Sequence, residues 1–161
     1  MSNIPAIPED YQTVTPYLTV NDAAAALVFY EKAFGAMEIL RLKMPDGKVG
    51  HAEFKIGQSI FMISDEYPDS SSKSPLSLDG SSVKLHVYVN DVDASYAQAI
   101  AAGATVIMPP ANQFWGDRMG SLTDPFGHHW LLATHIEDVE PGEFQGRMEA
   151  FFATNQGCGG S

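Results

Sequence analysis

The chain has 161 residues, of which 45% are hydrophobic, and a formal net charge of −11. This length supports one hydrophobic core of ordinary size, so we expect a single domain over residues 1–161, and nine basic residues without a basic run argue against nucleic acid and anionic membranes as partners. The chain shows no signal-peptide pattern, no apolar run that approaches a membrane span, and a single cysteine, which together predict a cytoplasmic protein without an intrachain disulfide.

One strand-like stretch occurs twice. It runs from Val14 to Asp22 and again from Val83 to Asp91, and each copy alternates aliphatic residues with polar or aromatic ones. Such alternation is typical of a β-strand with one face covered and the other face open. Each copy ends in Asn-Asp, which caps the free backbone N–H groups of a helix, so an Ala-rich helix is expected after each. The repeat predicts one structural unit that is built twice.

The first unit is expected over residues 12–66. Its helix opens at Asp22, carries apolar residues at helical spacing and stops at Gly35. Strands are expected to follow at about residues 39–42, 49–56 and 59–64, with turns at Pro45-Asp46-Gly47 and Gly57-Gln58. The order of elements is therefore β-α-β-β-β.

A segment rich in Ser, Asp and Pro, residues 65–82, is interpreted as a linker to a second unit over residues 81–138. That unit repeats the order, with a helix from Asp91 to about Ala102 that ends at Gly103 and strands at Thr105–Met108, Arg118–Thr123 and His129–His135. Pro109-Pro110 is expected to end the first of these strands. A last helix, from Glu143 to about Phe152 within the C-terminal segment 139–161, is expected to pack on the domain or on a second copy.

The strands predict a polar surface on the side away from the helices. In the two first strands, the faces opposite the aliphatic residues carry Thr15, Tyr17 and Thr19 in one unit and Lys84, His86 and Tyr88 in the other. The strand from Val49 to Ile56 also alternates, so His51, Glu53 and Lys55 share one face. Such a face is either exposed to solvent or forms the wall of a polar cavity, and two such sheets facing one another would enclose a cavity.

These features resemble the vicinal oxygen chelate superfamily, and most closely its glyoxalase/bleomycin-resistance (PhnB-like) proteins. The resemblance covers about residues 12–138 and rests on the paired units and on four runs: Phe29-Tyr30-x-x-x-Phe34-Gly35, Gly50-His51-Ala52-Glu53, Trp115-Gly116-Asp117-Arg118 and Asp124-Pro125-Phe126-Gly127-His128. It implies an α+β fold in which two βαβββ modules form a curved eight-stranded sheet around a cavity, and it implies a homodimer. This fold serves isomerases, lyases, dioxygenases, transferases and drug binders, so it does not choose a function.

Metal-dependent members of that superfamily hold a divalent ion with one residue from each first strand and one from each last strand, usually His, Gln or Glu. The matching positions here are Thr15, Phe61 or Met62, Lys84 and Leu131. None is a good ligand, because lysine is a cation and leucine has no lone pair. The sequence therefore predicts no metal and no other cofactor, and metal-polarised glyoxalase I chemistry is not expected.

Three residues are candidates for catalysis. His51 and Glu53 are two residues apart on one strand and point to the same side, and His86 lies on the corresponding face of another strand. They are compatible with a displaced metal site or with a general acid–base pair. A polar interior in which His51 and Glu53 simply pair with Lys84 or Arg118 is the alternative that the residues favour. The sequence leaves these alternatives open.

Four residues are candidates for ligand binding. Tyr17 and Tyr88 lie on the helix-free faces, and Trp115 lies on a loop from which its ring can stack on a flat ligand. Arg118 in a cavity would favour a carboxylate or phosphate ligand. If the strand has already begun, Asp117 and Arg118 face opposite ways, so that one holds the loop while the other faces the ligand.

We therefore expect a cytoplasmic, homodimeric protein that binds a small organic molecule in a polar-aromatic cavity without the usual metal site. The alternative is a metal-dependent lyase, isomerase or dioxygenase with a displaced site drawn from His51, Glu53 and His86, so the question of enzymatic activity stays open. A subunit that only mediates assembly is a third hypothesis. His135 is expected at the surface and Cys158 in a Gly-rich tail, so neither is a candidate for the site.

Overall fold

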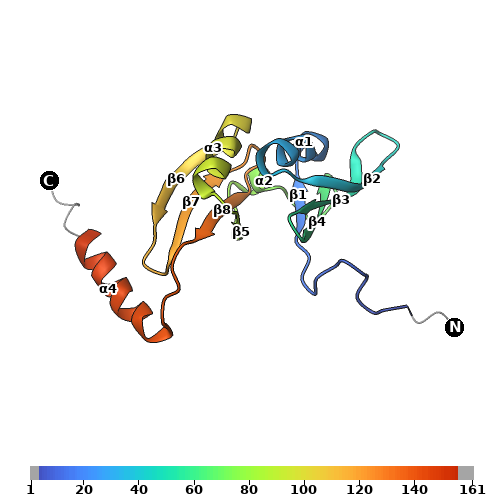
Figure 1. The fold of residues 1–161 in the computed structure, drawn as a ribbon. Helices are drawn as coiled ribbons and strands as arrows, with labels where there is room; N and C mark the ends of the chain where they lie inside the picture. Colours follow the sequence, from blue (N-terminus) through green and yellow to red (C-terminus); the bar gives the residue numbers. More distant parts are fainter. Residues whose placement is uncertain (1–3, 156–161) are drawn as a thin grey trace.

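The computed structural model of the protein describes residues 4–155 (Figure 1), so Cys158 lies outside the described residues. The first unit consists of β1 (Tyr17–Val20), α1 (Ala23–Phe34), β2 (Met37–Lys43), β3 (Val49–Ile56) and β4 (Ser59–Asp65). The second unit consists of β5 (Lys84–Tyr88), α3 (Val92–Ala102), β6 (Thr105–Asn112), β7 (Asp117–Thr123) and β8 (His129–His135). The linker contains the one-turn helix α2 (Pro75–Leu78), and a 3-10 turn (Pro141–Glu143) leads into the C-terminal helix α4 (Phe144–Asn155).

The residues that bound α1 and α3 are the predicted ones. The Asp22 side chain accepts a hydrogen bond of 2.9 Å from a backbone N–H in the first turn of α1, and Asp91 accepts one of 3.0 Å in α3. Gly35 closes α1 in the left-handed conformation, with φ of 64°, which a residue without a Cβ adopts at little cost. Gly103 closes α3. Both helices and their limits are therefore confirmed.

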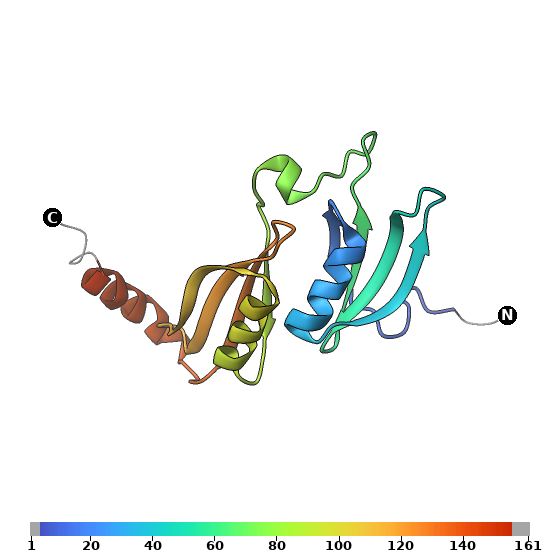
Figure 2. The same cartoon turned by 90° about the horizontal axis from the view of Figure 1, so that it is seen from above.

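Each unit folds its strands into a four-stranded sheet, in the order β1-β4-β3-β2 for the first and β5-β8-β7-β6 for the second. In both sheets the first strand pairs in parallel with the last strand, and the other pairs are antiparallel. The predicted α+β fold of two βαβββ modules is confirmed. Its eight strands form two sheets that lie side by side and are not closed into one, and no strand pairing joins them within residues 4–155 (Figure 2).

The predicted end of a strand at Pro109-Pro110 is wrong, because β6 continues to Asn112. Only one side of β6 is paired, with β7, so the missing N–H groups of the prolines need not interrupt a ladder. The pairing register shifts between Met108 and Ala111, on either side of the prolines. An edge strand therefore accommodates two residues that would break a central one.

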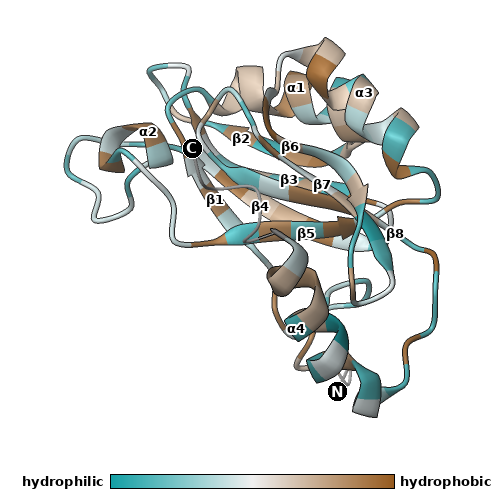
Figure 3. Ribbon diagram, turned by 90° about the vertical axis from the view of Figure 1, so that its left-hand side faces the viewer, coloured by the Kyte–Doolittle hydropathy of each residue, from teal (hydrophilic) through white to brown (hydrophobic). Residues whose placement is uncertain are grey.

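A continuous core joins the two units. The helices α1 and α3 pack beside one another on the same side of the sheets (Figures 1 and 3). Trp130 of β8 is fully buried, and the centroid of its ring lies 5.4 Å from that of Tyr30 and 4.6 Å from that of Phe34, both of which belong to α1. The buried carboxylate of Asp124 accepts hydrogen bonds from Tyr30 Oη at 2.8 Å and from Trp130 Nε1 at 2.9 Å, and so ties the two units together.

The other side of the sheets carries no helix of either unit. The N-terminal arm, residues 4–16, and α4 lie on this side, and α4 contains both hydrophobic and hydrophilic residues (Figure 3). The rings of Phe151 and Phe114 lie 5.7 Å apart and hold α4 near the β6–β7 turn. Within residues 4–155 we find no helix with the length and apolar character that a membrane span requires.

Candidate functional site

The strand pairing places the predicted site residues Tyr17, His51 and Glu53 on the helix-free face of the first sheet, where Met62 joins them. Tyr17 of β1 and Glu53 of β3 both lie opposite Met62 of β4, one on either side, so the three residues form one row across the sheet. The alternate positions of β1, Leu18 and Val20, are buried, whereas Tyr17 remains 50% exposed. The alternation seen in the sequence therefore predicts the two faces correctly.

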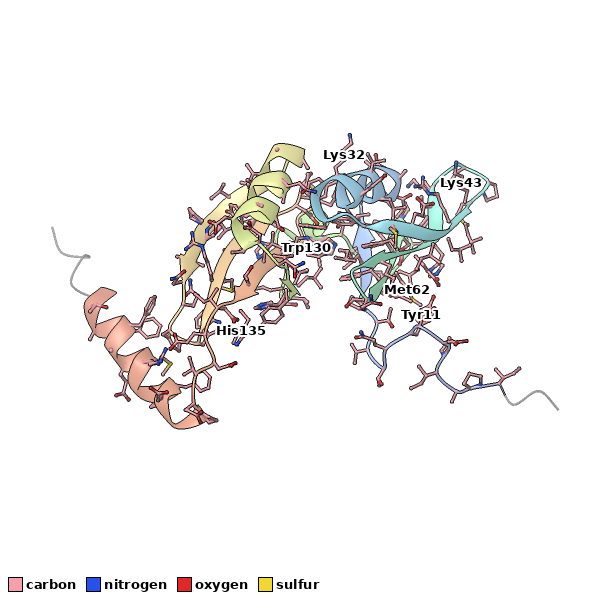
Figure 4. The ribbon with its side chains drawn as sticks, viewed as in Figure 1. Tyr11, Lys32, Lys43, Met62, Trp130 and His135 are labelled. Atoms are coloured by element: carbon pink, nitrogen blue, oxygen red, sulfur yellow. The ribbon has the colours of Figure 1, made fainter. Side chains whose placement is uncertain are left out.

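A chain of hydrogen bonds runs along this face. Tyr17 Oη lies 2.9 Å from His51 Nδ1, and His51 Nε2 lies 3.1 Å from Glu53 Oε1. The arm extends the chain, because the Tyr11 hydroxyl donates to the second oxygen of Glu53. Figure 4 shows Tyr11 and Met62 close together on this side of the first sheet. The structure thus brings Tyr17, His51 and Glu53 together and adds Tyr11.

The partners define where the protons lie. A carboxylate only accepts hydrogen bonds, so in the neutral imidazole of His51 the proton lies on Nε2 and points to Glu53. His51 Nδ1 is then an acceptor, and the Tyr17 hydroxyl donates to it. The hydrogen bonds from Tyr11 and then from His51 lower the pKa of the Glu53 carboxyl, so this group is ionised at neutral pH.

Apolar side chains flank this polar chain. Leu42 and Leu40 of the edge strand β2 lie opposite His51 and Glu53 and are 53% and 40% exposed. The arm forms one wall of an open cavity of about 520 Å³, which Glu53 and Met62 also line. This volume lies within the range of pockets that bind small molecules in proteins, roughly 300–1,000 Å³. Polar groups with fixed hydrogen-bond directions beside exposed apolar surface are the usual composition of such pockets.

The helix-free face of the second sheet carries a second cluster, centred on Asp117. This side chain is almost completely buried and accepts three hydrogen bonds, from Tyr88 Oη at 3.0 Å, from Trp115 Nε1 at 3.0 Å and from His135 Nδ1 at 2.8 Å. Burial opposes ionisation of Asp117, but these three hydrogen bonds outweigh it and lower the pKa of the carboxyl. His86 joins the cluster through its ring, which lies 4.8 Å from the ring of Tyr88.

His135 lies between two carboxylates at the end of β8 (Figure 4). Its Nε2 lies 2.9 Å from Asp138 Oδ1, in addition to the bond between Nδ1 and Asp117. The hydrogen bonds of Asp138 and of Asp117 raise the pKa of the imidazole. The ring therefore binds the end of β8 to the segment that leads to α4.

Four predicted residues lie apart from the cluster of the first sheet: His86, Tyr88 and Trp115 belong to the second cluster, and Arg118 belongs to neither. Arg118 forms a two-pronged ion pair with Asp93 of α3, at 2.7 and 2.8 Å, which places its guanidinium on the helix side of the second sheet. Asp117 and Arg118 do face opposite ways, and it is Asp117 that joins Tyr88 and Trp115 on the helix-free face. His86 belongs to the second sheet and is not part of the hydrogen-bond chain of His51.

The sequence alone did not identify Tyr11, Asp117 or His135 as members of these clusters. The contact between Tyr11 and Glu53 joins residues 42 positions apart, and the arm carries no periodic pattern that would indicate it. The antiparallel register of β7 and β8 places Asp117 opposite His135. The hairpin turn Asp124-Pro125-Phe126-Gly127 between these strands was a usable signal. In an antiparallel hairpin, residues at equal distances from the turn lie opposite one another, and this rule pairs Asp117 with His135.

The residues at the family's metal positions do not fit a metal ion. Phe61 is buried and stacks on Phe54 in the core, and Lys84 and Leu131 offer a cation and an aliphatic chain. Within residues 4–155, no three or more His, Cys, Asp or Glu side chains lie close enough together to hold an ion. His51 and Glu53 are neighbours, but the third proposed ligand, His86, belongs to the other sheet.

Comparison with known proteins places this arrangement in a family. Residues 12–132 match the model of the Glyoxalase/Bleomycin resistance protein/Dioxygenase superfamily. An uncharacterized protein of Mycobacterium tuberculosis is 44% identical over 140 residues, which cover 85% of this chain and 82% of that protein. An X-ray structure of a gene product from Arabidopsis thaliana, 28% identical, superimposes with a TM-score of 0.63 and covers 76% of this chain and 98% of the other.

The same fold occurs in the PhnB protein of Bacillus cereus, which is 22% identical and superimposes with a TM-score of 0.61 over 76% of this chain and 99% of that chain. At this level of identity the likeness concerns the fold alone. The PhnB-like resemblance predicted from the sequence motifs is thereby confirmed at the level of fold.

Proposed function

The chain belongs to the Glyoxalase/Bleomycin resistance protein/Dioxygenase superfamily, and from this premise we propose that it binds a small organic molecule on the helix-free face of its first sheet, without the usual metal ligands. The single observation that carries the proposal is the hydrogen-bonded chain of Tyr17, His51 and Glu53 beside the cavity under the arm. Glu53 lines the cavity, and Tyr17 at the other end of these hydrogen bonds is 50% exposed.

The residues of this face have separate roles in the proposed binding. Leu40, Leu42 and Met62 contact the apolar part of the ligand. Tyr17 Oη and the remaining lone pairs of Glu53 accept hydrogen bonds from it. His51 holds both groups in position, because its two ring nitrogens are bonded to one of them each. Tyr88 and Trp115, also predicted to bind the ligand, would belong to a second wall of the binding site, formed by a second sheet.

We further propose that this second wall comes from another copy of the chain, in a cytoplasmic homodimer. The helix-free faces expose large apolar side chains that a monomer leaves in water, including Leu42 at 53% and Tyr88 at 64%. Covering them with the opposite face of a second copy would enclose the cavity. Light scattering after size-exclusion chromatography is expected to give twice the chain mass, and a monomer mass at micromolar concentration would reject the dimer.

The binding proposal is tested with a small-molecule library and NMR spectra of the full-length protein. Ligands are expected to shift the signals of the Met62 methyl group and of the His51 ring. His51→Ala is expected to weaken binding, and His129→Ala, on the second sheet, serves as the matched control. If all binders shift only signals of the second unit, or if His51→Ala and the control behave alike, the proposal is refuted.

A metal-dependent lyase, isomerase or dioxygenase is the second candidate, and the contact between His51 and Glu53 is the observation that favours it. Elemental analysis of the purified, dialysed protein separates the two candidates. A bound ion near one per chain that is lost in His51→Ala supports the metal enzyme. Ligand binding that is unchanged after chelation of metals supports the first proposal.

A further inference from the structure

In the neutral form of the His51 ring, all the protons of the hydrogen bonds that join Tyr17, His51, Glu53 and Tyr11 point inward. The Tyr11 hydroxyl and His51 Nε2 donate to Glu53, and the Tyr17 hydroxyl donates to His51 Nδ1. These hydrogen-bonded side chains therefore present only oxygen lone pairs to their surroundings, on the two tyrosine hydroxyls and on the carboxylate. A ligand that complements this arrangement must be a hydrogen-bond donor, because an acceptor would face other acceptors.

Within residues 4–155, the Glu53 carboxylate also forms no ion pair with a lysine or arginine side chain. The Glu53 side chain is 13% exposed, and within residues 4–155 its one ion-pair contact is with His51. Lys55 shares the same face two residues further along β3, but no ion pair with Glu53 forms there. A partly buried carboxylate without a lysine or arginine partner gains most from a cationic hydrogen-bond donor.

The cavity under the arm reinforces this preference. Glu53 is the only charged residue among those that line it, and the apolar lining includes Ile7, Pro8 and Met62. The formal charge of the whole chain, −11, attracts cations and repels anions. The one cation that the sequence offered for an anionic ligand, Arg118, is paired with Asp93 on the helix side of the second sheet.

We propose that the site selects small molecules with a protonated amine, or a similar cationic nitrogen donor, attached to an apolar body. The amine would bind the outward lone pairs of Glu53 and Tyr17, and the apolar body would lie against Met62 and the arm. This inference rests on the proposed function, since it names the ligand class of that same site. It excludes carboxylates and phosphates as preferred ligands.

Three probes of similar shape test the charge preference: 4-phenylbutylamine, 4-phenylbutan-1-ol and 4-phenylbutyrate. Their dissociation constants are measured with the full-length protein at neutral pH and low ionic strength, from the shift of the Met62 methyl signal. We expect the amine to bind about tenfold more tightly than the alcohol, since a charge-assisted hydrogen bond is about twice as strong as a neutral one. The carboxylate is expected to bind most weakly.

Two variants separate the local charge from the overall charge. Glu53→Gln keeps the shape of the side chain and is expected to reduce the ratio of alcohol to amine dissociation constants to about one. Glu38→Gln removes one negative charge from the exposed strand β2, where Glu38 pairs with Arg41, and is expected to keep the ratio. Circular dichroism confirms that each variant is folded.

The outcomes distinguish this inference from the proposed function. If the amine and the alcohol bind the wild type equally well, the charge preference is refuted and the binding site stands. If Glu53→Gln keeps the preference, or if Glu38→Gln abolishes it as fully, the preference belongs to the overall field of the protein and the inference is overturned. If neither this set nor the library binds on the first sheet, the proposed function fails and the inference fails with it.

Discussion

The buried carboxylate of Asp124 provides a quantitative test of how the two units are joined. Asp124 is 4% exposed and accepts four hydrogen bonds. Its Oδ2 accepts from Tyr30 Oη at 2.8 Å and Trp130 Nε1 at 2.9 Å, and its Oδ1 accepts from the backbone N–H groups of Phe126 and His128, each at 2.9 Å. A substitution at this position therefore changes the contact between α1 and β8 and the turn before β8 together.

The structure predicts different costs for two substitutions. In Asp124→Asn, the amide oxygen keeps the two backbone bonds and the amide nitrogen faces Tyr30 and Trp130. The Tyr30 hydroxyl can reverse and accept, but the indole N–H of Trp130 can only donate, so one buried donor loses its partner. We expect a loss of about 2 kcal/mol of unfolding free energy. Asp124→Ala leaves both side-chain donors and the turn unpaired, and we expect about 4 kcal/mol.

Urea unfolding followed by circular dichroism measures both values. Asp46→Asn is the matched control, because the Asp46 carboxylate also accepts a backbone N–H in a turn but is exposed. Its cost is expected to stay below about 1 kcal/mol. If Asp124→Asn is as costly as Asp124→Ala, the division of bonds between the two oxygens is refuted. If Asp124→Ala costs no more than the control, the carboxylate does not join the two units.

Two further predictions concern the end of the second sheet. Gly116 has φ of 96°, and a Cβ there would lie 2.1 Å from the carbonyl oxygen of Glu137. We therefore expect Gly116→Ala to lose about 3 kcal/mol of unfolding free energy in the same urea assay. A neutral effect would contradict this close approach. Because Asp138 and Asp117 raise the pKa of His135 in the folded state, its contribution to stability is present below the unfolded pKa of about 6.5 and is lost as the pH rises through the folded value. The stability difference between wild type and His135→Asn is therefore expected to be larger at about pH 5.5 than at about pH 8.5, and a difference that is independent of pH would contradict the contacts.

Local features of the fold were predictable because they depend on neighbouring residues. The caps at Asp22 and Gly35 act within one helical turn, and the alternation of β1 and β3 places Tyr17, His51 and Glu53 on one face. The pairing of these three residues also follows from sheet geometry, because β3 and β1 both lie next to β4. The shared face of these residues was therefore accessible from the sequence, but the expected pairing of His51 and Glu53 with Lys84 or Arg118 is wrong, because Tyr17 and Tyr11 are the partners.

The remaining features depend on contacts between distant parts of the chain. Arg118 was expected to face a ligand. Whether Asp117 or Arg118 faces the helices depends on the pairing register of β7, and a shift of one residue in that register would exchange their positions. The contact of Tyr11 with Glu53 depends on the path of an arm without periodic pattern. Pro109-Pro110 was expected to end a strand, and its tolerance depends on β6 being at the edge of its sheet.

The most direct test of the central claim is to locate a bound ligand. The full-length protein, labelled at the methionine methyl groups and histidine rings, is screened against a small-molecule library by NMR. The account predicts that the strongest binders shift Met62 and His51 together and that Glu53→Gln changes their affinities, while Met108 on β6 stays unmoved. Binders that shift signals only around Trp115 and His135, and that are unaffected by Glu53→Gln, would contradict it.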